Sequence, residues 1–132
     1  MKKNWIWIIL FLIALVTLYL FKSEKSLKIH VGMANVVDTE SLAIELELNG
    51  NKIFNDTIRN YNYGFYTIDK DIKGVYQTIS VKRLDNNQVT SSSFFVLADK
   101  SIVIEFSEPC DDIDNAPPCF RIRSMYKPFL LE

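Results

Sequence analysis

The chain has 132 residues, 15 basic and 16 acidic side chains, and two cysteines. This length allows at most one ordinary domain. Residues 1–26 hold four of the lysines and one glutamate, so residues 27–132 keep 11 basic and 15 acidic side chains. A nucleic-acid-binding protein needs a basic face, and we therefore expect no nucleic-acid partner.

The N-terminal part of the chain contains a long uncharged run at residues 4–21. Eighteen residues in a helix extend about 27 Å, close to the hydrocarbon thickness of a bilayer. A cleaved signal would end in small residues, whereas this run ends in Leu18-Tyr19-Leu20-Phe21. We predict a retained transmembrane signal-anchor helix at 4–21 in contact with the lipid bilayer, a short cytoplasmic tail at 1–3, a linker at 22–26 and an extracytoplasmic domain at 27–132.

The orientation of the anchor does not follow from charge alone, because lysines lie on both sides of it. The short N-terminal tail and the use of cysteine favour an N-in orientation. Many Lys, Asn and Ile residues beside only four Arg suit a bacterium of low GC content. We therefore expect a single-pass protein of the bacterial inner (cytoplasmic) membrane, with its C-terminal domain in the periplasm or outside the cell.

From Leu27 onward apolar and polar side chains alternate, which is typical of strands with one buried face. Asn49-Gly50 is a strong type I′ hairpin signal, and residues 69–74 are expected to form a turn. Such short strands separated by turns predict an all-β fold, an antiparallel β-sandwich or barrel of about seven or eight strands. The expected strands are 27–31, 42–48, 52–58, 63–68, 75–82, 88–97, 101–106 and 119–124.

The stretch Asp71-Ile-Lys-Gly74-Val-Tyr76-Gln-Thr-Ile79-Ser-Val81 resembles a strand entry of immunoglobulin-like and transthyretin-like sandwiches. It is similar to the tyrosine corner, in which a ring hydroxyl bonds back to the preceding loop. The spacing departs by one residue from the antibody pattern, and no cysteine follows Tyr76. The resemblance implies a β-sandwich, a fold that hosts receptors, adhesins, sugar binders and assembly subunits alike.

The two cysteines, Cys110 and Cys119, enclose eight residues that include two prolines. Two thiols and the distant His30 are too few for a zinc site, and a redox C-x-x-C motif is absent. We predict a structural disulfide that pins a surface loop.

That loop is acidic, with Glu108, Asp111, Asp112 and Asp114 within seven positions. Several carboxylates in one loop could bind calcium, but the EF-hand pattern with its turn glycine is absent. A solvated loop is favoured, with a basic partner surface as its simplest ligand. We expect neither a metal nor a cofactor.

Two further groups of side chains are candidate contacts for a partner or ligand. Tyr61, Tyr63 and Tyr66 belong to an aromatic cluster in which Tyr63 and Phe65 would face one side and Tyr66 the other. The second group, Tyr126, Phe129 and Leu130, makes the C-terminal segment unusually apolar. It would either close one end of the core or dock on a partner or membrane.

The sequence offers few residues suited to catalysis. His30 is the single histidine, and no G-x-S-x-G or H-E-x-x-H pattern is present. We therefore expect no enzyme. The preferred hypothesis is an interaction or assembly subunit of a bacterial envelope complex whose partners are membrane protein subunits. The alternative is a membrane-displayed module that binds glycans or cell-wall material.

Overall fold

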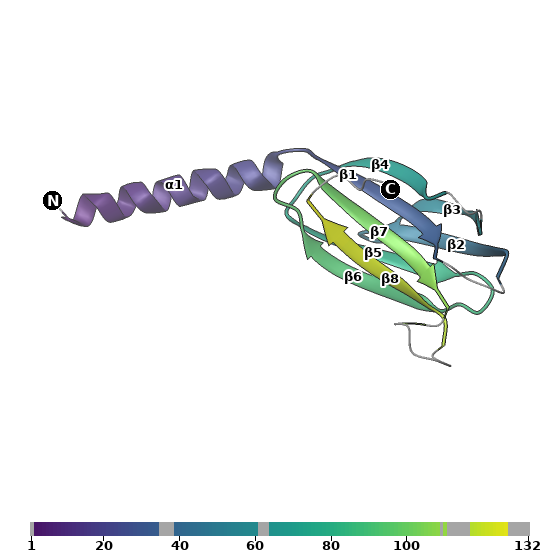
Figure 1. The fold of residues 1–132 in the computed structure, drawn as a ribbon. Helices are drawn as coiled ribbons and strands as arrows, with labels where there is room; N and C mark the ends of the chain where they lie inside the picture. The colour runs from purple at the N-terminus through teal and green to yellow at the C-terminus, as the bar shows by residue number, and fades with distance from the viewer. Residues whose placement is uncertain (1, 35–38, 61–63, 109, 111–116, 127–132) are drawn as a thin grey trace.

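The computed structural model describes residues 2–34, 39–60, 64–108, 110 and 117–126. It consists of one N-terminal helix followed by two four-stranded sheets that face each other (Figure 1). The elements are α1 (Lys2–Lys22), β1 (Lys25–Met33), β2 (Ser41–Leu48), β3 (Asn51–Arg59), β4 (Tyr66–Ile72), β5 (Tyr76–Arg83), β6 (Val89–Phe95), β7 (Lys100–Ser107) and β8 (Cys119–Met125).

The strand order is β4-β1-β7-β8 in one sheet and β3-β2-β5-β6 in the other. This arrangement confirms the predicted all-β sandwich. One pair departs from the antiparallel expectation, because β1 and β7 run parallel. The order also differs from that of an immunoglobulin constant domain, where the first two strands are neighbours in one sheet. Here β1 lies between β4 and β7 and is not a neighbour of β2.

The core lies between the sheets and is built from the alternating apolar positions that the sequence predicts. Strands such as β1 and β2 send every second side chain inward because successive side chains point to opposite faces. The two central strands of each sheet supply most of the fully buried residues. These are Leu27, Ile29 and Val31 of β1, Ile44 and Leu46 of β2, Ile79 and Val81 of β5, and Ile102 and Ile104 of β7, all 0% exposed.

The hairpin between β2 and β3 turns at Asn49 and Gly50, whose φ angles are 52° and 78°. The type I′ prediction is therefore confirmed in its requirement for positive φ at both positions. The side-chain Nδ2 of Asn49 donates to Gln77 Oε1 at 2.6 Å, and Gln77 Nε2 donates to the backbone carbonyl oxygen of Lys73 at 2.9 Å. Gln77 is only 1% exposed, so these bonds satisfy a polar group inside the core.

Two local predictions around β4 and β5 were wrong. Residues 69–72 belong to β4 instead of a turn, because β4 is an edge strand that pairs only with β1 and leaves its charged side chains in solvent. Tyr76 differs from a tyrosine corner, since its side chain is 58% exposed and its ring packs edge-on against Phe95 at 5.4 Å. Gln77, the next residue, is the polar side chain that enters the core.

Helix α1 is joined to the sandwich by Ser23 and Glu24 alone. The connection is therefore shorter than the linker expected at 22–26, because Lys25 already begins β1. The Lys25 Nζ donates to the carbonyl oxygen of Leu20 at 2.6 Å and to that of Ser23 at 3.2 Å. The helix is long and apolar enough to span a membrane.

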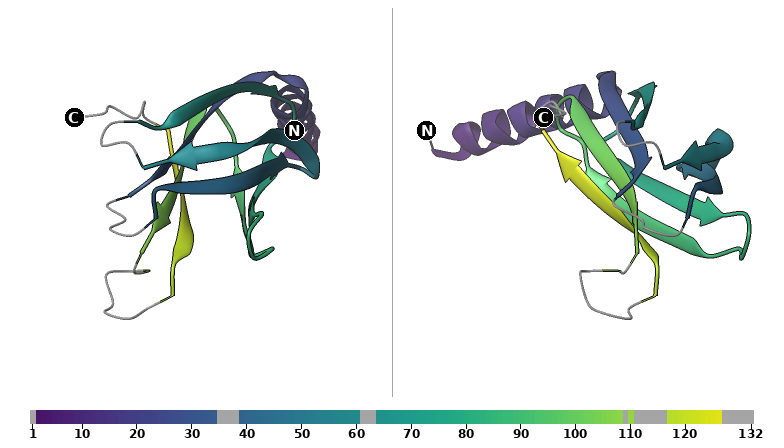
Figure 2. Two further views of the ribbon diagram at one scale, coloured as in Figure 1. Left: turned by 90° about the vertical axis from the view of Figure 1, so that its right-hand side faces the viewer. Right: turned by 45° about the vertical axis from the view of Figure 1, so that its right-hand side comes forward.

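The sandwich has two ends, which we name by their distance from the helix (Figure 2). The proximal end, from which α1 leaves, holds the first residues of β1 and β7, the last residues of β4, β6 and β8, and the Asn49-Gly50 turn. The distal end holds the opposite ends of the same strands, where β2 begins and β3 ends.

Candidate functional site

The candidate contact residues predicted from the sequence do not form one site. Tyr66 lies at the distal end, where it begins β4 opposite Val31 of β1. Tyr126 directly follows β8 and therefore lies at the proximal end. The other predicted contacts lie outside the described residues: Tyr61, Tyr63, Asp111, Asp112, Asp114, Phe129 and Leu130.

The aromatic cluster is described only in its second half, and there the predicted division between two faces holds. Tyr66 is 39% exposed, and its ring lies 5.9 Å from that of Phe54 on β3. Phe65 is half-buried on the other side, against Gly32 of β1. A Cβ at Gly32 would stand 2.6 Å from the Phe65 ring, so the glycine makes room for the close packing of that ring.

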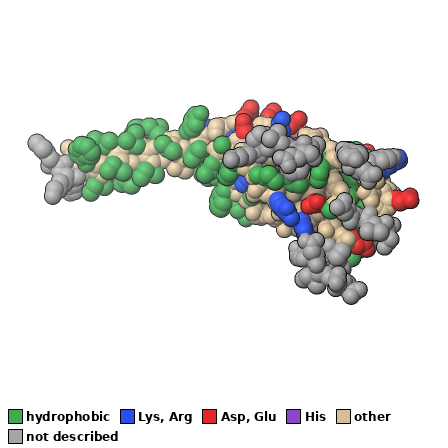
Figure 3. Space-filling model, viewed as in Figure 1, with side chains coloured by type: hydrophobic (Ala, Val, Ile, Leu, Met, Phe, Trp, Pro, Cys, Tyr) green, Lys and Arg blue, Asp and Glu red, His purple; other side chains and the backbone are tan. Residues whose placement is uncertain are grey.

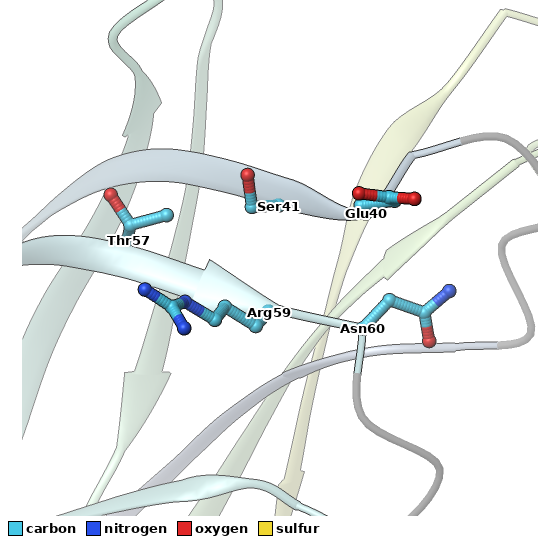
Figure 4. A pocket seen from close by; sticks show the side chains of 5 residues that line it. All are labelled: Glu40, Ser41, Thr57, Arg59 and Asn60. Carbon is cyan, nitrogen blue, oxygen red and sulfur yellow. The ribbon is translucent and has the colours of Figure 1, made fainter.

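A polar pocket of about 490 Å³ lies at the distal end of the β2-β3 hairpin (Figure 4). Its lining consists of Glu40, Ser41, Thr57, Arg59 and Asn60. Ser41 and Arg59 are opposite each other in the strand register, and the Asn60 N–H donates to the Glu40 carbonyl oxygen at 2.8 Å. Figure 4 shows that the lining residues come from two neighbouring strands and from the chain just beyond them.

The outward direction of the pocket follows from the alternation along β2. Leu42 is buried between the sheets, so its neighbour Ser41 and the opposite residue Arg59 lie on the outer face. The next pair along the hairpin is Ala43 with the pocket residue Thr57. Arg59 also lines a second hollow of about 160 Å³ beside Tyr66. Arg59 therefore lies between the polar pocket and the ring of Tyr66.

A hydrogen bond joins the chain beside this pocket to the residues that lie between β7 and the disulfide. Thr39, next to the pocket residue Glu40, donates its hydroxyl to Glu108 Oε2 at 3.3 Å. Cys110 and Cys119 are bonded, with 5.4 Å between their Cα atoms, which confirms the predicted pairing. The disulfide holds residue 110 against the first residue of β8.

The chemistry of the pocket is that of polar recognition. Arginine offers a planar fork of donors that suits carboxylates, while the carboxylate, hydroxyl and amide groups can bond to donors and acceptors of a ligand. Within the described ranges no group of three or more His, Cys, Asp or Glu side chains could hold a metal ion.

His30 does not line the pocket. It lies on the outer face of the β4-β1-β7-β8 sheet, as the alternation predicts, with Nδ1 3.1 Å from Thr67 Oγ1. Partial burial lowers the pKa of the imidazole, the Lys28 charge lowers it further, and Asp69 raises it. The pocket lies on the outer face of the other sheet, so the histidine and the arginine do not share a site.

Arg83 forms a separate interaction at the distal end of β5. Its guanidinium group lies 5.0 Å from the centre of the Phe106 ring on the other sheet, and Nε donates to Asp85 Oδ1 at 3.0 Å. This hydrogen bond lowers the pKa of the Asp85 carboxyl. The contact joins the two sheets and adds nothing to the pocket.

The pocket was missed by the sequence analysis because its five residues are ordinary polar residues at strand ends, without a motif. The Asn49-Gly50 signal predicts that β2 and β3 pair, but the bulge between Leu46 and Glu47 shifts their register, so this signal alone does not place Ser41 opposite Arg59. Comparisons of the chain with protein-family models, curated proteins and solved structures found no match.

Proposed function

We propose that this protein is a non-enzymatic, single-pass subunit of a bacterial envelope complex, anchored by α1 and binding membrane protein subunits through its sandwich. The observation that carries the proposal is the junction, where two residues separate the helix from β1. Two extended residues reach only about 7 Å. A sandwich held so close to the bilayer meets mainly other proteins of the same membrane.

The junction is also ordered, which favours assembly over display. Lys25 is 5% exposed and bonds to the carbonyl oxygens of Leu20 and Ser23. A receptor for distant ligands gains from a long, flexible spacer. A subunit gains instead from a fixed angle between its helix and its domain, because both can then contact the same partner.

The disulfide supports a location outside the cytoplasm, since such bonds persist in oxidising compartments. In the proposed orientation the N-terminus lies in the cytoplasm and the sandwich lies on the outer side of the cytoplasmic membrane. The absence of an enzyme activity is part of the proposal. It is supported by the separation of His30 from the polar pocket on opposite outer faces.

The distal pocket is the proposed contact for the partner. Arginine and tyrosine are enriched at protein interfaces, and here Arg59 lies between the pocket and Tyr66. The partner surface should present donors for Glu40 and carboxylates or carbonyl groups for Arg59.

Pull-down of the intact protein from membranes in mild detergent tests this function. The expected result is a stoichiometric membrane partner that is retained by the wild-type protein and largely lost with Arg59→Ala. Lys52→Ala is the matched control, because Lys52 is a cation at the other end of β3 that pairs with Glu45. If no partner co-purifies with the wild-type protein, the subunit proposal is wrong.

A second candidate function is a module that binds glycans or cell-wall material. The observation in its favour is the combination of a hydroxyl- and amide-lined pocket with the neighbouring aromatic ring of Tyr66. Sugars bind through hydrogen bonds and stacking on aromatic rings. Retention of the detergent-solubilised protein on purified cell-wall material, lost with Arg59→Ala and without any protein partner, would favour this function.

A further inference from the structure

Four large hydrophobic side chains are exposed together at the proximal end, and we call them the proximal patch: Tyr76, Phe95, Leu97 and Tyr126. They are 58%, 61%, 54% and 55% exposed, respectively. Tyr76 and Phe95 are cross-strand neighbours on β5 and β6, and Leu97 follows β6. Exposed apolar groups of this kind mark contact surfaces.

The patch is held in a fixed arrangement. Lys100 is 7% exposed, donates from Nζ to Phe95 O at 2.8 Å, and places this cation 4.5 Å from the centre of the Tyr126 ring. The Tyr126 hydroxyl donates to the same carbonyl oxygen at 3.3 Å. The Tyr76 and Phe95 rings pack edge-on at 5.4 Å. A surface ordered in this way is prepared for contact before it binds.

The patch lies beside the point where α1 ends. The Ser26 N–H, near the start of β1, donates to Asp99 Oδ1 at 2.8 Å, which ties the β6-β7 connection to the helix junction. Figure 3 shows hydrophobic side chains along α1 and again on the end of the domain from which α1 leaves. If α1 spans the bilayer, the short junction brings this end of the sandwich to the headgroup region.

We propose that the proximal patch inserts into the interfacial region of the bilayer that holds α1. Aromatic rings with a polar tip prefer the headgroup level, and Tyr76 and Tyr126 have this character. Lys22 in the last turn of the helix places a cation at the same level, where lipid phosphates lie. The sandwich would thus contact the membrane at two points, the helix and the patch, which fixes its tilt.

This inference rests on the proposed membrane anchoring. Fluorescence quenching by brominated lipids tests the anchoring of α1 and the insertion of the proximal patch independently. The full-length protein is placed alone in vesicles of phosphatidylcholine and phosphatidylglycerol with bromine on the acyl chains. Quenching of the native Trp5 and Trp7 tests the anchor. In a Trp5→Phe, Trp7→Phe background, Phe95→Trp reports on the patch, and Val89→Trp is the control at the distal end of the same strand, where Val89 is 56% exposed.

The expected result is a strong loss of emission and a shift to shorter wavelength for Phe95→Trp, with neither change for Val89→Trp. Equal, weak quenching of both reporters, with Trp5 and Trp7 still quenched in the native protein, would overturn the insertion and indicate that a partner protein covers the patch. Unquenched Trp5 and Trp7 would overturn the anchor and the insertion together.

Discussion

Lys25 Nζ donates to the carbonyl oxygen of Leu20 at 2.6 Å, so the first residue of the sandwich bonds to the last turn of the helix. The last four carbonyl groups of a helix have no partner within it, and a cation is favourable there because of the helix dipole. One buried side chain thus satisfies the helix end and begins β1. We therefore expect the angle between helix and sandwich to depend on this lysine.

Replacing Lys25 with methionine should loosen the junction. The variant keeps the apolar stem but loses two hydrogen bonds from a charged donor, each worth about 1.5–3 kcal/mol. Hydrogen exchange at the Ser23 amide, which bonds to Tyr19 O, should become about tenfold faster or more. Lys73→Met is the control, because its ion pair with Glu24 is exposed and should contribute little. Equal exchange rates in both variants would refute the role of Lys25.

The hairpin turn should depend on Asn49 in two separable ways. Asn49→Gly keeps the positive φ but removes the donor to the buried Gln77 Oε1 and the acceptor of the Thr78 N–H, at an expected loss of about 1–2 kcal/mol in unfolding free energy. Asn49→Ala should lose about 1 kcal/mol more, because alanine is strained at φ 52°. Denaturant unfolding of both variants measures the difference. Equal stability of the glycine and alanine variants would contradict the strain argument.

The β-sandwich could be predicted because its core follows a simple period. Strands such as β2 alternate strictly, and the Asn49-Gly50 signal fixed their hairpin. The order of the strands could not be predicted, since the pairing of β1 with β7 joins residues about 73 positions apart, such as Leu27 and Lys100. No local pattern records such a pairing.

The pocket could not be predicted because it depends on one irregularity. An unbroken two-residue hairpin would place Ser41 opposite Ile58, which is a core residue. The bulge between Leu46 and Glu47 shifts the register, so that Ser41 lies opposite Arg59 on the outer face. The charged residues within 69–73 suggest a turn, but an edge strand such as β4 tolerates charges that a central strand would not.

Removal of the disulfide should destabilise the domain without unfolding it. The chain-entropy model gives about 2–3 kcal/mol for closing a loop of this length. In a domain of about 100 residues this corresponds to a fall in Tm of roughly 10 °C for Cys110→Ser with Cys119→Ser. Treating the wild-type protein with reductant should give the same fall. Two free thiols in unreduced protein from the native host would contradict the bond and the proposed compartment.

His30 should titrate below its ordinary pKa of about 6.5. The unfolded chain then binds the proton more tightly, so the contribution of His30 to stability is present above about pH 6.5 and is lost as the pH falls through the folded pKa. An NMR titration of this single histidine checks the midpoint. Lys28→Gln should raise it and Asp69→Asn should lower it, and shifts in the opposite directions would refute the assigned causes.

The intact mass of the protein extracted from bacterial membranes tests the central claim most directly, because assembly at the membrane requires that α1 is retained. We expect the extracted protein to contain the residues before Lys22 and to remain in the membrane when it is washed with alkaline carbonate. A mature chain that begins near Ser23 would show that the helix is cleaved off, and would contradict the anchor, the fixed junction at Lys25 and the proposed subunit together.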